Sequence, residues 1–282
     1  MKLASVLLAG APAFGAISEA AYIDLTQHFG DRCRDLRTLL ASTELLDDAR
    51  AYTRTAKATP LDGVRFLPLI PNADARMFAL GWSYRDHQIE TGTDAPEHPV
   101  IFSKHPQAMV GSGEPLIRPR ISERFDYEGE IVVVIGRAGR NVPASSAMDH
   151  VAGYSIAMDG SIRDFQKHSV TAGKNFDASS SYGPWLVTAD EIADPKAMEL
   201  VTRLNGNEMQ RTTFGLLAWE VGDLVAYVST ITKLEPGDSI STGTPAGVGH
   251  KRVPPVFLKA GDVVEVDVRP IGTLRNVVRD EA

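Results

Sequence analysis

The chain has 282 residues, 43% of them hydrophobic, which is enough for one large domain or for one large and one small domain. Its net charge of -7, the lack of any Lys/Arg tract and the lack of an apolar run of roughly 18 residues argue against nucleic acid and membrane as partners. A small molecule is therefore the expected partner. The only cysteine, Cys33, cannot form an intramolecular disulfide, and we expect a cytoplasmic location.

Residues 1–75 are predicted to form a small N-terminal α/β domain without catalytic residues. Short apolar runs at 1–11 and 21–25 predict strands joined by turns rather than a signal peptide. Leucine spacing predicts helices at 35–40 and 44–50. The proline-punctuated segment 64–71 is predicted to be an extended connector, so we place the domain boundary just after it.

Residues 76–282 carry many short apolar runs separated by Gly, Pro, Asn and Asp, which predicts a mostly β domain and, for the whole chain, an α+β fold class. One long helix is predicted at 214–231, where leucines and valines recur at helical spacing. The predicted strands span residues 77–80, 100–102, 130–135, 151–158, 185–187, 201–204, 239–242 and 262–268.

Two glutamates mark the start of the most apolar strand. Glu128 and Glu130 are two residues apart, so their carboxylates point to the same face. Asp159 ends the next apolar strand and is able to bring a third carboxylate to the same place. Three carboxylates suit a hard divalent ion such as Mg2+, Mn2+ or Ca2+. Taken alone, the Glu128/Glu130 pair is also compatible with a solvated strand face.

Other segments add candidate acid, base and donor groups. His87 and Glu90 are three residues apart and share a face if their segment is helical, which is typical of an oriented general base but also of a surface contact. Arg163 and Gln166 follow Asp159 and offer donors near the predicted metal, although Arg163 could instead pair with Asp164.

Two lysines and one loop complete the set of candidates. Lys174 lies in a tight glycine turn, where its charge could meet an anionic substrate oxygen, and Lys104 follows an apolar strand as a second candidate. Either lysine could equally be exposed and without a role. The glycine-rich segment 240–249 lacks the Gly-Lys-Ser/Thr of a nucleotide-binding loop, but its backbone N–H groups and the Thr244 hydroxyl could bind a carboxylate.

In this order, the segments resemble those of the fumarylacetoacetate hydrolase superfamily, in its acylpyruvase-like or 2-hydroxyhepta-2,4-diene-1,7-dioate isomerase-like branch. The resemblance covers the chain from about Met77 to the C-terminus. It is carried by five motifs: Tyr84-Arg85-Asp86-His87, Glu128-Gly129-Glu130, Asp159-Gly160-Ser161-Ile162-Arg163-Asp164, Gly173-Lys174-Asn175-Phe176-Asp177 and the run from Thr242 to Gly249.

The resemblance implies a catalytic domain built on a mixed β-sheet roll after a small N-terminal domain, and a homodimer. It implies that Glu128, Glu130 and Asp159 bind Mg2+, Mn2+ or Ca2+. His87 and Glu90 would form a water-activating dyad, with Lys174 as a further catalytic residue. Substrate binding would involve the following residues: Tyr84, Arg85, Lys104, Arg163, Gln166, Gly243 and Thr244.

One departure from the motifs of the superfamily concerns the wall of the pocket. Met158 and Gly160 replace a polar residue and a larger side chain, so we expect a wider or more apolar wall beside Asp159. The substrate implied is a small anionic keto acid.

The expected reaction is hydrolysis of a carbon–carbon bond in a β-diketo acid of the acylpyruvate or fumarylpyruvate type through an enolate. Decarboxylation of an oxaloacetate-like acid, and isomerisation or hydration of an unsaturated hydroxy-diacid, remain alternatives in the same site. A binding module without catalysis is the alternative from another class.

Overall fold

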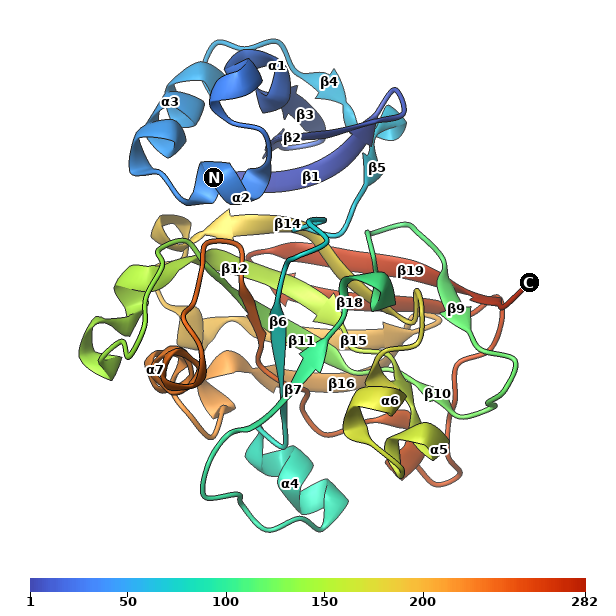
Figure 1. Cartoon of the computed structure of the whole chain (residues 1–282). Helices are drawn as coiled ribbons and strands as arrows, with labels where there is room; N and C mark the ends of the chain where they lie inside the picture. Colours follow the sequence, from blue (N-terminus) through green and yellow to red (C-terminus); the bar gives the residue numbers. More distant parts are fainter.

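Two β-sheets form the centre of the computed structural model, which describes all residues 1–282 (Figure 1). The longer sheet follows the order β4-β3-β2-β1-β14-β12-β11-β17-β6-β7, with β5 and β8 attached at its side, and the smaller sheet follows the order β16-β15-β18-β19-β9. Both parallel and antiparallel pairs occur, since β17 pairs with β6 in parallel and β11 pairs with β12 in antiparallel fashion. The predicted α+β, mostly β, fold class is confirmed.

The N-terminal segment adds its strands to the longer sheet. Its elements are β1 (Lys2–Leu8), β2 (Ala11–Ser18), β3 (Ala21–Asp24), α1 (Leu25–Phe29), α2 (Leu36–Leu40), α3 (Thr43–Thr53), β4 (Thr59–Pro60) and β5 (Arg65–Phe66). The joint between the two parts is the antiparallel pairing of Lys2 with Val187 and Leu3 with Leu186. The domain boundary after residue 75 stays a prediction, and the sheet itself continues across it.

The remaining elements contain every strand that the sequence predicts for residues 76–282. In the longer sheet these are β6 (Met77–Gly81), β7 (Val100–Lys104), β8 (Met109–Val110), β11 (Gly129–Ile135), β12 (Val151–Met158), β14 (Ser180–Thr188) and β17 (Ser239–Ser241). The smaller sheet holds β9 (Leu116–Arg118), β15 (Glu199–Leu204), β16 (Asn207–Thr213), β18 (Val263–Arg269) and β19 (Gly272–Asp280), and a separate pair is formed by β10 (Phe125–Asp126) and β13 (Ser161–Ile162).

Four helices complete this part: α4 (Arg85–Thr91), α5 (Arg163–Gln166), α6 (Val170–Lys174) and α7 (Val221–Ile231). The predicted helix 214–231 is wrong in its first half, because α7 begins at Val221. Before it, Leu217 forms a β-bridge with Tyr84, and the Ala218 N–H donates to the Ser83 carbonyl. These long-range backbone contacts replace the helical hydrogen bonds, and only a short 3-10 turn remains at Phe214–Leu216.

Side chains on the two faces of β11 enter different cores. Ile131, Val133 and Ile135 belong to the large apolar cluster that also contains residues of β18 in the smaller sheet. Val132 and Val134 belong to a second cluster that contains residues of the N-terminal strands and helices. Since side chains alternate along a strand, Glu130 lies on the face of Val132, at the end of the strand where apolar packing stops.

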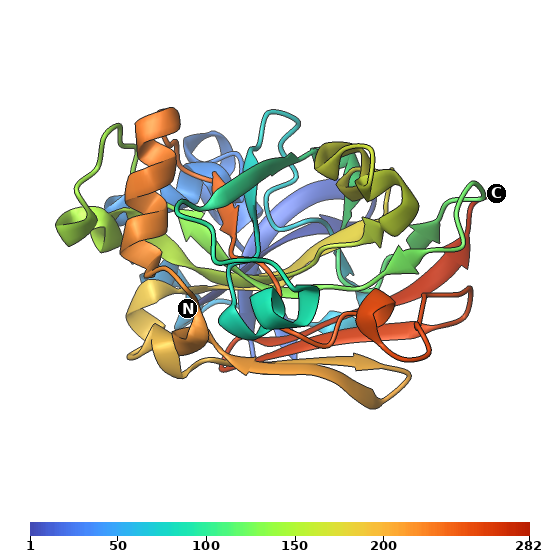
Figure 2. The same ribbon diagram turned by 90° about the horizontal axis from the view of Figure 1, so that it is seen from below.

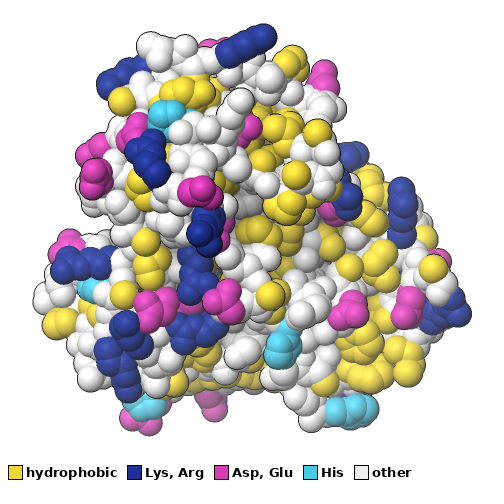
Figure 3. Space-filling view, turned by 45° about the horizontal axis from the view of Figure 1, so that its top comes forward, with side chains coloured by type: hydrophobic (Ala, Val, Ile, Leu, Met, Phe, Trp, Pro, Cys, Tyr) yellow, Lys and Arg dark blue, Asp and Glu magenta, His cyan; other side chains and the backbone are white.

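The surface carries charges of both signs. On the face shown in Figure 3, Lys and Arg side chains are interspersed with Asp and Glu. Seen from the opposite end to the N-terminal segment, α4 lies in front of the strands (Figure 2). None of the helices combines the length and the apolar character needed to cross a membrane.

Candidate active site

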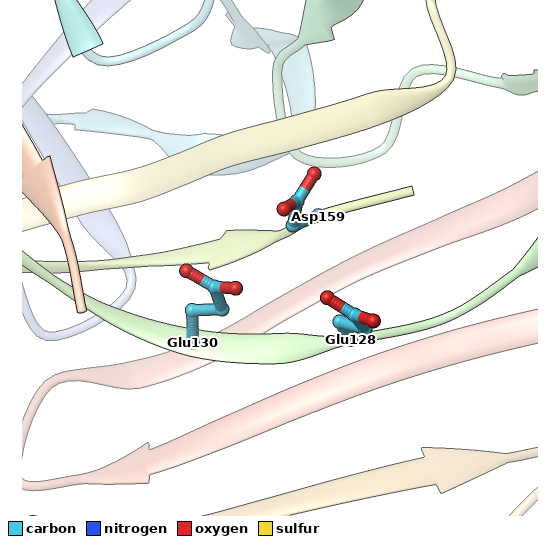
Figure 4. A group of neighbouring side chains, drawn as sticks. All are labelled: Glu128, Glu130 and Asp159. Atoms are coloured by element: carbon cyan, nitrogen blue, oxygen red, sulfur yellow. The ribbon is translucent and has the colours of Figure 1, made fainter. Parts of the chain in front are cut away.

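Three buried carboxylates meet at one end of β11 and β12. The two strands are antiparallel with Gly129 opposite Met158, so the residues just beyond this pair, Glu128 and Asp159, are also opposite each other. The Asp159 N–H donates to the Glu128 carbonyl at 2.8 Å and fixes this register. One oxygen from each of Glu128, Glu130 and Asp159 lies within 4.8 Å of the others (Figure 4). The structure therefore brings the three predicted metal ligands together.

The surroundings of Glu130 indicate that the three carboxylates suit a cation. Its Oε2 accepts hydrogen bonds from the Ser241 hydroxyl at 2.5 Å and the Gly243 N–H at 3.0 Å, whereas its buried Oε1 has no donor. Burial, followed by the nearby charge of Asp159, raises the pKa of Glu130 to about 8. A buried acceptor without a donor, beside two more carboxylates, is what a hard divalent ion with oxygen ligands would satisfy. The residues present fit such an ion.

Two lysines support the carboxylates from inside the protein. The Lys104 ammonium donates to Asp159 Oδ1 at 2.7 Å, to the Ser180 hydroxyl at 2.8 Å and to the Lys174 carbonyl. The Lys174 ammonium donates to Asp159 Oδ2 at 2.8 Å and to Glu128 Oε2. Burial and the charge of Lys174 lower the pKa of Lys104. Burial also acts to lower the pKa of Lys174, but Asp159 and Glu128 outweigh it and the pKa is raised.

These contacts define where the two lysines act. All three protons of the Lys104 ammonium are engaged within the protein, and Lys104 is only 4% exposed, so it holds Asp159 from behind. Its predicted contact with substrate stays a prediction.

Lys174 does not lie in a tight glycine turn as expected, because it is the last residue of α6. The preceding Gly173 allows the helix to pack against Gln166, where a Cβ would lie 2.5 Å from the Gln166 nitrogen.

Arg163 pairs with different acids from the one that adjoins it in the chain. Its Nη2 lies 2.8 Å from Asp126 Oδ2 and 2.7 Å from Glu128 Oε1, so the alternative Arg163/Asp164 pair is wrong. Asp164 instead accepts from the Ser122 hydroxyl at 2.6 Å. Burial acts to raise the pKa of Asp126, but Arg163 and hydrogen bonds from His250 outweigh it, so the pKa is lowered.

Asp126 is a site residue that the sequence reasoning missed. It is completely buried, and it also accepts from the backbone N–H groups of Tyr127, Gly249 and His250. Its position two residues before Glu128 was the available signal, since side chains two apart in an extended segment share a face. It fixes Arg163 and the loop after Thr244 relative to the carboxylates.

Helix α4 carries the predicted dyad. His87 Nδ1 lies 3.0 Å from Glu90 Oε2, and Glu90 Oε1 accepts from the Gly247 N–H at 2.8 Å. Burial acts to raise the pKa of Glu90, but the hydrogen bonds from His87 and Gly247 outweigh it and the pKa is lowered. The ionised carboxylate directs Nδ1 as a donor and leaves Nε2 as the basic nitrogen. Burial acts to raise the pKa of Glu128, but the charges of Lys174 and Arg163, followed by that of His87, outweigh it and the pKa is lowered.

The remaining residues predicted to bind substrate differ in whether their polar groups already have hydrogen-bond partners within the protein. The Gln166 Oε1 accepts from Arg163 at 2.9 Å, and its amide N–H groups have no partner. The Gly243 N–H donates to Glu130, and the Thr244 hydroxyl donates to the Gly129 carbonyl and accepts from Gln210. The loop therefore supports the strand that carries the carboxylates.

Tyr84 and Arg85 occupy opposite environments at the start of α4. Tyr84 is completely buried with its hydroxyl unpartnered, and burial followed by the charge of Glu130 raises its pKa. Arg85 is exposed. Substrate contacts for these two residues and for Gln166, Gly243 and Thr244 stay predictions.

The expected wider or more apolar wall beside Asp159 is wrong. A Cβ on Gly160 would lie 1.8 Å from the Ser179 carbonyl oxygen and 2.8 Å from the Phe125 ring, so this glycine permits close packing and opens no space. Met158 is buried in the large apolar cluster between the sheets. Met158 and Gly160 therefore contribute to packing within the protein and not to the wall of the pocket.

The chain belongs to the fumarylacetoacetate hydrolase family. The model of the family described as "Fumarylacetoacetate (FAA) hydrolase C-terminal" matches residues 76–279, which include all the carboxylates and the dyad. The superfamily resemblance is thereby confirmed.

Three proteins show the range of activities among the relatives. A mitochondrial oxaloacetate tautomerase of Bos taurus is 39% identical over 233 residues, covering 81% of this chain and 74% of the relative. The solved fumarylacetoacetate hydrolase of the psychrophile Exiguobacterium antarcticum is 33% identical with a TM-score of 0.85, covering 100% of both chains. The solved 2-hydroxyhepta-2,4-diene-1,7-dioate isomerase of Mycobacterium marinum is 30% identical with a TM-score of 0.77, covering 100% of this chain and 99% of that one.

Proposed function

We propose that the chain is a divalent-metal-dependent enzyme that interconverts the keto and enol forms of an oxaloacetate-like 2-oxo acid. The observation that carries the proposal is the group of three buried carboxylates with the unpartnered Glu130 Oε1. The likeness to an oxaloacetate tautomerase over 81% of the chain supports this reaction over the carbon–carbon hydrolysis expected from the sequence.

Glu128, Glu130 and Asp159 would hold the ion, Mg2+ or Mn2+, with Ca2+ also compatible with oxygen ligands. When bound, the ion supplies a Lewis acid that favours the negative charge of an enolate. Lys104 and Lys174 keep Asp159 oriented, and Arg163 keeps Glu128 oriented, so the ligand set is held before substrate arrives.

In the proposed reaction, His87 would move the proton at C3 of the substrate. In the direction from keto to enol, Nε2 takes the C3 proton, the C–H electron pair forms the C2–C3 double bond, and the carbonyl pair moves to the C2 oxygen. Water then protonates the C2 oxygen, and the His87 imidazolium returns its proton to the resulting hydroxide, so that the base is neutral again. Glu90 orients His87 through Nδ1 and stabilises the imidazolium. The free N–H groups of Gln166 would donate to the C2 oxygen as negative charge develops there.

Hydrolysis of an acylpyruvate is the second candidate, and the His87–Glu90 contact favours it, because the same base is able to take a proton from water. Attack on the distal carbonyl would break the bond to the central carbon and leave a pyruvate enolate. Decarboxylation of an oxaloacetate-like acid passes through the same type of enolate. The candidates therefore differ in which bond breaks, and the products separate them.

The test follows the decay of enol absorbance of oxaloacetate with Mg2+ or with EDTA, while mass spectrometry identifies products from oxaloacetate and from a panel of acylpyruvates. We expect Mg2+-dependent acceleration without loss of CO2, and its loss in His87→Ala. Cleavage of an acylpyruvate with an enol decay no faster than in buffer would instead establish the hydrolase. Absence of turnover with every substrate would leave a binding module. Light scattering tests the proposed homodimer.

A further inference from the structure

A cavity of about 310 Å3 adjoins the candidate active site and is lined by cations. Arg163 and Gln166 line both places, and the other polar side chains around the cavity are Arg124, Lys167 and His250. No lining residue is acidic, in a chain whose net charge is -7. We propose that this cavity binds the second acid group of a dicarboxylic 2-oxo acid, with Arg124, Lys167 and His250 as specificity-determining residues.

The pairing of two short strands places Arg124 beside the site. In the antiparallel pair β10–β13, Phe125 is opposite Ile162 and Asp126 is opposite Ser161. Arg124 and Arg163 flank the Phe125–Ile162 pair, and the Arg163 N–H donates to the Arg124 carbonyl at 3.0 Å. The long-range strand contact thus sets an exposed arginine next to the buried arginine that holds Glu128.

The other walls of the cavity follow from contacts to the same strand. Lys167 comes directly after α5, four residues from Arg163, which puts both on one side of the helix. The His250 N–H donates to Asp126 Oδ2 at 2.9 Å, and His250 Nδ1 lies 3.3 Å from the same oxygen. Phe257 lines the cavity because the adjoining Leu258 N–H donates to the Phe125 carbonyl at 2.7 Å.

Arg124 and Lys167 differ from the more deeply buried cations in their pairing. Arg163, Lys174 and Lys104 each form ion pairs with buried carboxylates. The Arg124 guanidinium and the Lys167 ammonium form no ion pair or hydrogen bond within the chain. The buried acid beside Arg124 in this segment, Asp126, already pairs with Arg163. An incoming carboxylate therefore finds unpaired donors, and a planar arginine fork suits it well.

The cavity adjoins the place where the proposed function sets the other end of the substrate, because Arg163 and Gln166 belong to both. The proposal rests on the proposed function, in which the 2-oxo acid end lies at the three carboxylates and near Gln166. The remote end of the same molecule then points past Gln166 toward Arg124 and Lys167. A neutral group at that end would leave these cations unpaired, so the cavity discriminates between dicarboxylic acids and their monoesters.

The experiment compares oxaloacetate with its 4-methyl ester in the presence of Mg2+. The test protein is Arg124→Gln/Lys167→Gln. The matched control is Arg34→Gln/Lys57→Gln, which removes the same charge from exposed residues of the N-terminal segment. We measure kcat/KM of tautomerisation for acid and ester, and the affinity of each by calorimetry. The ratio of acid to ester should fall about tenfold or more in the test protein and stay unchanged in the control.

The outcomes separate the inference from the proposed function. If the ratio falls equally in both double variants, the effect is one of long-range charge alone. If the ratio is unchanged in the test protein, the cavity does not bind the second acid group. Either result overturns the inference. If the wild-type chain turns over neither compound, the proposed function fails. The calorimetric ratio then still decides whether Arg124 and Lys167 select the dicarboxylic form.

Discussion

His87 and Glu90 lie one turn apart on α4, with His87 Nδ1 3.0 Å from Glu90 Oε2, and Glu90 also accepts from the Gly247 N–H. One carboxylate thus orients the imidazole and ties α4 to the loop that follows Thr244. Glu90 therefore both orients the base and holds α4 in position.

We predict that Glu90→Gln lowers kcat by about 100-fold, because the amide no longer stabilises the imidazolium, a loss typical of impaired general base catalysis. Steady-state kinetics with Mg2+ measures the loss, and calorimetry should show Mg2+ affinity within threefold of wild type. Glu97→Gln, at an exposed position further along the same segment, serves as the control and should retain activity. A strong loss of Mg2+ binding in Glu90→Gln would assign Glu90 to the metal site instead.

Two metal-ligand variants are predicted to have opposite effects on the metal-free protein. Asp159→Asn leaves the buried Lys104 and Lys174 without a full counter-charge, and we expect a loss of about 3 kcal/mol in the free energy of unfolding. Glu130→Gln replaces a carboxylate that burial and Asp159 already disfavour in its charged form, so stability at pH 8 should be kept or raised. Urea unfolding in EDTA measures both, and Mg2+ binding should be lost in both. Equal destabilisation would contradict the assigned environments.

Glu130 also predicts a dependence of stability on pH. Its pKa is about 8 in the folded chain and near the ordinary value of 4.5 when the chain is unfolded, so between these values the folded state holds the extra proton. The free energy of unfolding of the metal-free protein should therefore fall, through this group, as pH rises from about 5 to 8. Subtracting the pH profile of Glu130→Gln from that of wild type isolates the slope. A difference that is flat over this range would show that Glu130 is ionised throughout.

Gly160→Ala is predicted to destabilise the chain by about 2 kcal/mol, because the added methyl group would meet the Ser179 carbonyl oxygen at 1.8 Å and force the strands apart. The matched control is Gly63→Ala, where a Cβ meets nothing within 4 Å and stability should change little. Thermal unfolding in EDTA measures both variants. Similar melting temperatures for the two would mean that the space beside Asp159 is open after all.

The cluster of three carboxylates was predictable from the sequence because its geometry follows from the positions of the residues along two neighbouring strands. Glu128 and Glu130 lie two apart on an apolar strand, and Asp159 ends the next strand, so alternation and antiparallel pairing suffice to bring them together. The strands in residues 76–282 were predictable for the same reason, apart from those such as β16 and β19 whose alternating polar residues face solvent.

Other parts depend on contacts between distant segments, which one sequence does not reveal. The partners of Arg163 are set by the pairing of β10 with β13, so sequence proximity wrongly suggested Asp164. The late start of α7 depends on the bridge between Leu217 and Tyr84. The tight packing at Gly160 depends on Ser179. The prediction of a wider pocket wall was wrong because it took the lack of a side chain at Gly160 to mean empty space.

The buried charges around the site have a kinetic consequence. Four carboxyl groups lie beside three cations there: Asp126, Glu128, Glu130 and Asp159 beside Lys104, Arg163 and Lys174. Because Glu130 keeps its proton below about pH 8 in the metal-free chain, the charges balance, and a bound divalent ion would make the centre positive. We therefore expect ordered binding, with the ion entering first and the anionic substrate second. Without the ion, the centre would have no net positive charge with which to attract an anionic substrate.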